Sequence, residues 1–159
     1  MRTKRGFTLV EILIVVVILG ILAAIVIPQF TEASTEAKTS SLMSDLQSIR
    51  SQIELYKIQH NDAMPGDTTG DGIADDAANF VIDLTTKTNQ AGTPWVAGQT
   101  AYGPYLQKFP TNPFSTINGN AIEVVAAAPV LGAGDGDPGW YFETATEGFG
   151  ANSEDHEQY

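Results

Sequence analysis

The chain has 159 residues, a formal net charge of −11 at neutral pH and no cysteine. This length leaves room for one modest folded domain beside any membrane anchor. The acidity argues against nucleic acid as a partner, because phosphate binding needs a basic surface. Without cysteine there is no disulfide, no thiolate metal site and no cysteine nucleophile.

The chain starts with a basic leader, residues 1–6, which is followed by an apolar run. Phe7 to Ile27 is 21 residues, and about 20 apolar residues cross a bilayer core as a helix. We therefore expect residues 7–28 to form a transmembrane helix, with the basic leader on the cytoplasmic side and the acidic bulk outside. Without the leader, 5 basic side chains face 19 acidic ones, a formal −14 that suits an extracytoplasmic surface.

Glu11 interrupts this apolar run. An ionised side chain at bilayer depth costs roughly 2.5–3.5 kcal/mol on insertion scales, which makes it a functional hypothesis by default. One interpretation places Glu11 near the start of the helix, where it reaches the head groups. In the other, cleavage between Gly6 and Phe7 creates a free amine one helical turn away, and the low dielectric makes its pairing with Glu11 strong.

The stretch Gly6-Phe7-Thr8-Leu9-Val10-Glu11, with the apolar run to Pro28, resembles the N-terminal signal of type IV pilins and type II secretion pseudopilins. In that family a prepilin peptidase cleaves after the glycine and methylates the new terminal phenylalanine. The resemblance thus implies processing at Gly6 and Phe7, and a role for Glu11 in assembly. An ordinary secretory signal is the alternative, but Glu11 would interrupt its apolar core and no small-residue cleavage site follows cleanly.

Gly20 and Pro28 are the weak points of the predicted transmembrane helix. Pro28 has no amide hydrogen and clashes with the carbonyl of Ala24, so a kink is expected there. The resemblance implies that the segment between Gly20 and Pro28 loses helicity on assembly. A plain transmembrane kink, tolerated by its neighbours, remains the alternative.

Residues 29–60 are amphipathic and predict a continuation of the same helix. From Phe7 to about His60 this helix would be roughly 80 Å long. The apolar seam is too short for a convincing coiled coil, so packing under a C-terminal domain is favoured. Steps of four and three place these apolar side chains on one face: Leu42, Leu46, Ile49, Ile53 and Tyr56.

The helix is predicted to end in the turn residues of segment 61–66, and an acidic loop follows. This loop has the 1-3-5-7-9 spacing of a calcium-binding loop, but Ala78 occupies the twelfth position, where a bidentate acid is expected. A solvated acidic turn, with Asp75 or Asp76 capping the next helix, is the alternative. The candidate calcium ligands are Asp67, Thr69, Asp71, the carbonyl of Ile73, and Asp75.

The remaining segment, within a predicted domain of residues 61–159, combines a short helix, loops and strands. We expect a helix over 76–86, with Phe80, Val81 and Leu84 facing inward. A loop should follow over 89–99, with Trp95 in the core or as a lid. The predicted strands are 121–127, 140–143 and 149–152. Residues 102–114 resemble the Tyr-Leu…Pro-x-Asn-Pro stretch of pseudopilin-like proteins and predict a short helical turn and an extended pass across the sheet. The predicted fold is α+β: a long N-terminal helix packed on a small C-terminal antiparallel sheet, the type IV pilin fold.

A second candidate calcium site lies near the C-terminus. The family's major pseudopilin carries calcium in a C-terminal loop, and Asp135 and Asp137 lie in a comparable place. The resemblance therefore implies calcium here as a rival to the first loop. No other cofactor is expected.

The resemblance implies a structural subunit of a type II secretion pseudopilus: a single-pass inner-membrane protein whose C-terminal domain is periplasmic and which forms a homo-oligomeric helical filament. The implied partners are prepilin peptidase, the inner-membrane assembly platform and minor pseudopilins. A type IV pilus subunit is the alternative, although many pilins have a C-terminal disulfide that this chain cannot form. A membrane-anchored binding module is a second alternative. Enzyme activity has little support, because His60 and His156 are the only histidines and no nucleophile motif is present.

Overall fold

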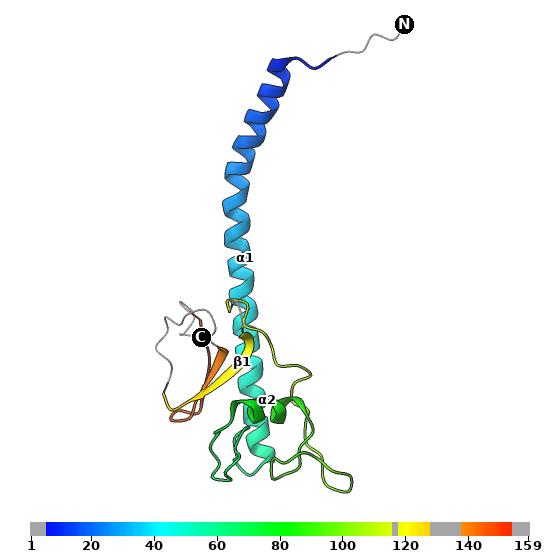
Figure 1. The fold of residues 1–159 in the computed structure, drawn as a ribbon, viewed down its shortest axis with the longest axis vertical. Helices are drawn as coiled ribbons and strands as arrows, with labels where there is room; N and C mark the ends of the chain where they lie inside the picture. Colours follow the sequence, from blue (N-terminus) through cyan, green and yellow to red (C-terminus); the bar gives the residue numbers. More distant parts are fainter. Residues whose placement is uncertain (1–5, 116–117, 128–137, 154–159) are drawn as a thin grey trace. The chain divides into compact units, whose positions relative to one another are not determined.

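The computed structural model describes residues 6–115, 118–127 and 138–153. These ranges contain two helices and three strands (Figure 1). The chain divides into two compact units, Met1–Lys38 and Thr39–Tyr159, and the first helix contributes to both. The α+β fold class is thereby confirmed. The elements are α1 (Leu9–Gln59), α2 (Ala77–Thr85), β1 (Asn118–Val125), β2 (Pro138–Glu143) and β3 (Gly148–Ala151).

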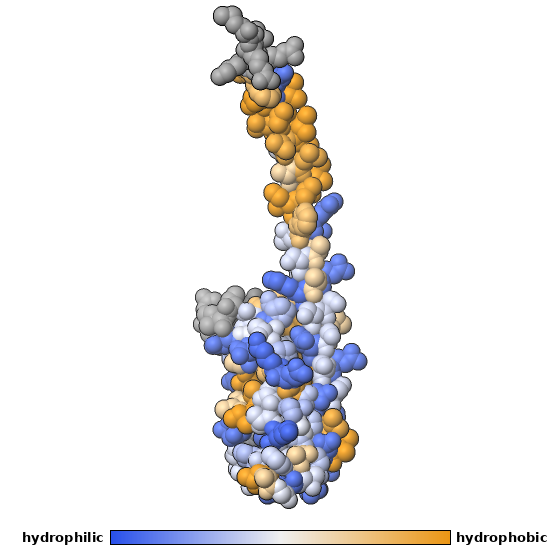
Figure 2. Space-filling model, turned by 90° about the vertical axis from the view of Figure 1, so that its right-hand side faces the viewer, coloured by the Kyte–Doolittle hydropathy of each residue, from blue (hydrophilic) through white to orange (hydrophobic). Residues whose placement is uncertain are grey.

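In the first unit, the described chain is mainly the apolar part of α1. All side chains from Leu9 to Ile27 are exposed, so this stretch has no core of its own. In Figure 2 its surface is almost continuously hydrophobic. Of the described helices, α1 is long and apolar enough to cross a membrane. Such a surface needs lipid or other subunits around it.

In the second unit, the predicted apolar face of α1 is confirmed. Its five side chains, from Leu42 to Tyr56, are at most 3% exposed. They belong to one buried cluster with residues of α2 and of the strands. Phe80 and Leu84 of α2 point inward as predicted, with Val81 partly buried against the same cluster. The other main members of the cluster are Met64, Phe109, Ile122, Trp140, Phe142 and Phe149.

The sheet is mixed, with strand order β1-β2-β3. β2 and β3 pair antiparallel, with Phe142 opposite Phe149, whereas β1 and β2 pair parallel. The expected antiparallel pairing therefore holds for β2 and β3 and not for β1 and β2. A parallel pair needs a crossover connection of about a dozen residues, and the chain between β1 and β2, residues 126–137, is long enough to provide one.

The start of the parallel pair depends on glycine. A Cβ atom at Gly139 would clash with the backbone of Gly119. Glycine at this position therefore permits the close approach of β1 and β2.

Segment 102–114 makes the predicted extended pass, but the short helical turn is not formed. Asn112 is fully buried and fixes this pass to the sheet. Its Nδ2 donates to the Gly139 carbonyl (2.7 Å), and its Oδ1 accepts from the Phe114 amide (2.9 Å). The indole of Trp140 donates to the Pro110 carbonyl at 3.1 Å. Prolines at positions 110 and 113 favour this extended course over a helical turn.

Trp95 is neither a core residue nor a buried lid. Its side chain is 37% exposed. The indole donates to the Gln99 carbonyl at 3.0 Å, and the Lys87 ammonium lies 5.7 Å from the ring centroid. Trp95 therefore belongs to an ordered surface loop.

Candidate processing and assembly site

The first turn of α1 positions the residues of the predicted processing site. Gly6, Phe7 and Thr8 precede the helix, and Phe7 is 84% exposed. The Thr8 amide and hydroxyl both donate to Glu11 Oε2 at 2.8 Å, and the Glu11 amide donates to Thr8 Oγ1 at 3.3 Å. This reciprocal arrangement is a capping box, in which Thr8 is the N-cap and Glu11 occupies the third helical position. It explains why the helix begins at Leu9.

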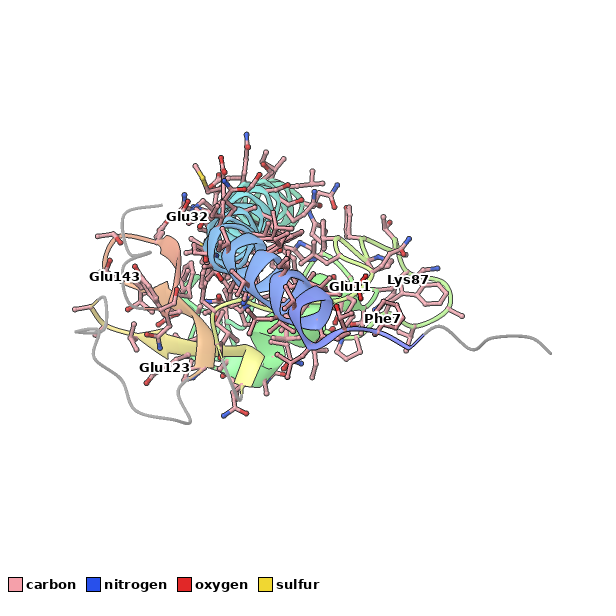
Figure 3. All side chains as sticks on the ribbon, turned by 90° about the horizontal axis from the view of Figure 1, so that it is seen from above. Phe7, Glu11, Glu32, Lys87, Glu123 and Glu143 are labelled. Carbon is pink, nitrogen blue, oxygen red and sulfur yellow. The ribbon has the colours of Figure 1, made fainter. Side chains whose placement is uncertain are left out.

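Glu11 therefore has intramolecular partners in the single chain. Its carboxylate lies at the N-terminal end of the helix, where the macrodipole favours negative charge. Figure 3 labels Phe7 and Glu11 at this end of α1. The sequence predicts that Glu11 either reaches the head groups or pairs with the future amine, and the structure adds Thr8 as an intramolecular partner. The signal was available in the spacing Thr8-x-x-Glu11 just before an apolar run.

The scissile bond predicted between Gly6 and Phe7 lies outside the helix, in exposed chain. Cleavage there would place a new amine at Phe7, one residue before the cap. A carboxylate has about four lone-pair sites. Glu11 can thus accept hydrogen bonds from an amine as well as from its own cap, which makes this helix end a suitable place for an ion pair.

Gly20 and Pro28 both lie within α1 in the single chain. A Cβ atom at Gly20 would meet no atom within 4 Å, so its own chain does not require glycine there. Loss of helicity between these two residues stays a prediction, because it concerns the assembled state.

The acidic loop uses its carboxylates as acceptors for its own backbone. The two oxygens of Asp67 accept from the amides of Gly70 (2.6 Å) and Gly72 (2.8 Å). Asp71 accepts from the Ile73 amide at 3.0 Å. The Thr69 hydroxyl points to Asp67 at 3.4 Å. These are the local turns typical of aspartate, and they fix the shape of the loop.

The end of the loop fits the alternative prediction of a helix cap. Asp76 is the N-cap of α2, and its side chain accepts from the Asn79 amide at 2.8 Å. Asp75 instead accepts from the Thr68 hydroxyl at 2.6 Å, and the hydrogen bonds from Thr68 lower the pKa of Asp75. The capping prediction is confirmed for Asp76.

Calcium itself stays a prediction. Across the described ranges, no three histidine, aspartate or glutamate side chains converge to hold a metal ion. The loop at Asp67 would need to rearrange or to receive a further ligand. Asp135 and Asp137 lie outside the described residues.

A buried polar cluster lies where the end of α1 meets α2 and the following loop. Asp83 is 8% exposed and accepts from the Gly66 amide at 2.8 Å. Burial raises the pKa of Asp83, and the hydrogen bonds from Gly66 and the Tyr56 hydroxyl oppose this shift. His60 stacks on Tyr56 at 3.8 Å between ring centroids, and its two ring nitrogens lie 2.9 Å from the Tyr56 carbonyl and the Thr88 hydroxyl. His60 is therefore a satisfied structural residue that is closed to a substrate.

Comparison with known proteins gives a consistent result. Residues 1–27 match the family model described as the prokaryotic N-terminal methylation motif. The chain is 34% identical over 125 residues to a type II secretion system core protein G of Pseudomonas aeruginosa, covering 79% of this chain and 75% of that protein. It is 32% identical over 116 residues to the protein of the same name from Klebsiella michiganensis, covering 71% and 70%. The corresponding protein of Dickeya chrysanthemi is 40% identical over 60 residues, covering 38% and 39%. No solved structure matches the chain significantly.

Proposed function

The chain belongs to the family of type II secretion system core protein G, and from this premise we propose how its N-terminal site serves a pseudopilus. The chain is a structural subunit of this filament, which polymerises through the N-terminal helices and drives protein export. The observation that carries the proposal is the capping box of Thr8 and Glu11. It places the family's processing motif at the exposed end of an apolar helix that has no core of its own.

Processing is the first step of the proposal. Prepilin peptidase cleaves after Gly6 and methylates the amine of Phe7. The exposed, non-helical conformation of Gly6 and Phe7 supports this, since a peptidase needs access to an unfolded peptide bond. We propose a structural role for the mature protein, with no catalytic role.

Membrane orientation is the second step. One apolar N-terminal helix suits a single-pass inner-membrane anchor. The basic leader favours a cytoplasmic N-terminus, which would place the acidic second unit in the periplasm. There we expect the subunit to meet minor pseudopilins, while its transmembrane part meets the inner-membrane assembly platform.

Assembly is the third step, and it depends on Glu11. In the free subunit the carboxylate is held by its own cap, at Thr8. When a new subunit joins the base of the filament, its Phe7 amine meets the Glu11 carboxylate of a subunit already in place. A charge-assisted hydrogen bond then offsets the desolvation of both groups and sets the axial register. The apolar side chains between Leu9 and Ile27 make non-directional hydrophobic contacts between subunits.

The test compares leader cleavage and filament yield in one Glu11→Val strain. We expect the variant to insert and to be cleaved, yet to polymerise poorly and to lose secretion. Glu11→Asp should be intermediate, because the charge is kept at a shorter reach. Normal filaments, or a failure at cleavage alone, would show that Glu11 has a different role.

Calcium binding by the second unit is a separate proposal. The spacing of Asp67, Asp71 and Asp75 supports it, and the resemblance supports Asp135 and Asp137 as a rival site. A ligand that binds only the folded state raises the melting temperature by mass action. We expect calcium to raise the melting temperature of the second unit. If the first loop binds the ion, the double variant Asp67→Ala with Asp71→Ala should no longer show this rise. Loss only in the double variant of Asp135 and Asp137 would assign the ion to the C-terminal loop, and no shift in the wild type would remove calcium from the account.

A further inference from the structure

Gly66 joins the two ends of the acidic loop, residues 67–75. Its carbonyl accepts hydrogen bonds from the amides of Asp75 at 3.0 Å and Asp76 at 3.1 Å. Its φ is +77°, and a Cβ atom there would lie 2.5 Å from the Asp76 carbonyl oxygen, so this position requires glycine. The loop therefore starts at Gly66 and returns to it.

Asp83 of α2 holds Gly66 in this place. Its Oδ2 accepts from the Gly66 amide at 2.8 Å, and the Tyr56 hydroxyl is its second partner. The residue is 8% exposed. It lies near the C-terminal end of α2, where the macrodipole disfavours negative charge, and Asp67 is close enough for the two charges to repel. Since a charge is disfavoured here, the position uses Asp83 for the hydrogen bond that its oxygen accepts.

The carboxylates of the loop are engaged by its own backbone. Asp67 accepts from the amides of Gly70 and Gly72. Asp71 accepts from the Ile73 amide. A cation that binds these carboxylates must compete with the amides, so the loop has to rearrange first. Most of the loop residues are exposed, which leaves few other contacts to break when it does.

We propose that Asp83 is a positioning residue that controls the opening of the acidic loop. In the closed loop, the bond between Gly66 and Asp83 fixes both ends. In the open loop this bond is broken, and the loop carboxylates become available to a cation while the sheet stays folded. Asp83 thus keeps most molecules closed, and this lowers the apparent affinity for any cation that binds the open loop. For calcium as that cation, the inference rests on the calcium binding proposed above.

Amide hydrogen exchange of the full-length protein in detergent, without calcium, measures this opening. Asp83→Ala removes the acceptor, so the loop amides of Gly70 and Gly72 should exchange faster by about tenfold or more. Asp83→Asn keeps an acceptor oxygen and should exchange nearly as slowly as wild type. The control amides are those of Thr88 and Tyr102, which bond to each other's carbonyls at the base of a different loop. That loop opens while Asp83 stays bonded, so their exchange should not change.

Two results of this measurement would overturn the proposal. One is equal exchange of the acidic loop in wild type and Asp83→Ala. The other is acceleration by the same factor at Thr88 and Tyr102, which would mean that the whole domain has loosened. If Asp83→Ala fails to fold, the wild type alone decides. Its amides at Gly66, Gly70 and Gly72 should share one opening free energy, smaller than that of the β2–β3 ladder, and opening only together with that ladder would contradict a local unit.

Calcium distinguishes a residue that restrains the loop from one that binds the ion. The titration uses a chain with Asp135→Ala and Asp137→Ala, which leaves the first loop as the candidate site, and follows the melting temperature. Adding Asp83→Ala should lower the half-saturating calcium concentration by about tenfold, because more of the loops are already open. A higher half-saturating concentration would mean that the Asp83 carboxylate itself attracts the ion, and would overturn the proposal. No calcium effect in any chain would remove the calcium proposal, and hydrogen exchange would still decide the role of Asp83.

Discussion

The two units of the chain are stabilised in different ways. In the first unit, three side chains make hydrogen bonds close to their own position: Glu11 bonds within the first turn, and Thr31 and Thr35 bond four residues back along the helix. The second unit adds hydrogen bonds between positions that are distant in the sequence. Arg50 donates twice to the Phe149 carbonyl, at 2.9 and 2.8 Å.

Because of this difference, the two units depend on different surroundings. A helix without a core is stable only in lipid or among other helices, so its sequence is constrained by membrane and neighbours. The second unit buries its own apolar side chains and is constrained by its own packing. Changes in the first unit should therefore affect processing and assembly without unfolding the domain, and changes in the second should do the reverse.

The largest expected effect is that of Gly6→Leu, which tests the first unit alone. Precursor should accumulate in the membrane with its leader attached, and no filaments should form, while the thermal unfolding of the second unit stays unchanged. Intact mass measurement of membrane fractions reads the result, since mature wild type should begin at Phe7 and carry one extra methyl group. Glu11→Val is the control that should still be cleaved. A functional wild-type pool that keeps residues 1–6 would contradict the processing site.

Trp140→Ala should destabilise the second unit and leave leader cleavage unchanged, the opposite of Gly6→Leu. Trp140 is fully buried and stacks on Phe149 at 5.6 Å between ring centroids. Removing the indole should destabilise the second unit by about 3–5 kcal/mol, as for other buried aromatic truncations. Urea unfolding of the full-length protein in detergent measures this loss. Leader cleavage should continue. Loss of cleavage would show that the peptidase depends on the folded domain, which would contradict the independence of the two units.

Asn112→Ala tests how much one buried hydrogen-bonding side chain stabilises the second unit. The change leaves the Gly139 carbonyl and the Phe114 amide without their partner, and unsatisfied buried groups cost about 1–3 kcal/mol each. We expect a loss of about 2–3 kcal/mol in the unfolding free energy. Thr111→Ala, at the exposed neighbouring residue, is the control and should stay within about 0.5 kcal/mol. Equal losses in both variants would mean that the side chain of Asn112 does not hold segment 102–114 to the sheet.

The smallest expected effect is the pH dependence of the contribution that Asp83 makes to the free energy of unfolding. Burial raises its pKa in the folded state. Its contribution to stability is therefore complete below the unfolded value, about 3.9, and is lost as pH rises through the folded value. The unfolding free energy of Asp83→Asn, relative to wild type, should rise with pH above about 4 and then level off.

Asp75→Asn provides a control of opposite sign. Hydrogen bonds from Thr68 lower the pKa of Asp75, so its contribution is present above the unfolded value and is lost as pH falls through the folded one. Urea unfolding between pH 3 and 7 distinguishes the two variants. Slopes of the same sign would contradict the environments assigned to these two carboxylates.

Much of the molecule follows from local sequence signals. The long helix, its buried face and the cap at Asp76 depend on spacing within one or two turns, and the structure has them as predicted. The parallel pairing of β1 with β2 and the burial of Asn112 depend on partners far along the chain, which periodicity does not encode. The capping box of Thr8 and Glu11 is also a local signal, since the spacing Thr8-x-x-Glu11 before an apolar run is its signature.

The central claim is that the Phe7 amine of one subunit pairs with Glu11 of another. Filaments assembled from a mixture of two labelled pools test it, with ¹⁵N at phenylalanine in one pool and ¹³C at the glutamate carboxyl carbon in the other. Solid-state NMR dipolar recoupling then reports only distances between subunits. The account predicts coupling between the resolved N-terminal amine and Glu11 at about 4 Å, as expected for a charge-assisted hydrogen bond. Coupling that is absent in mixed filaments and present only when both labels share one chain would contradict it.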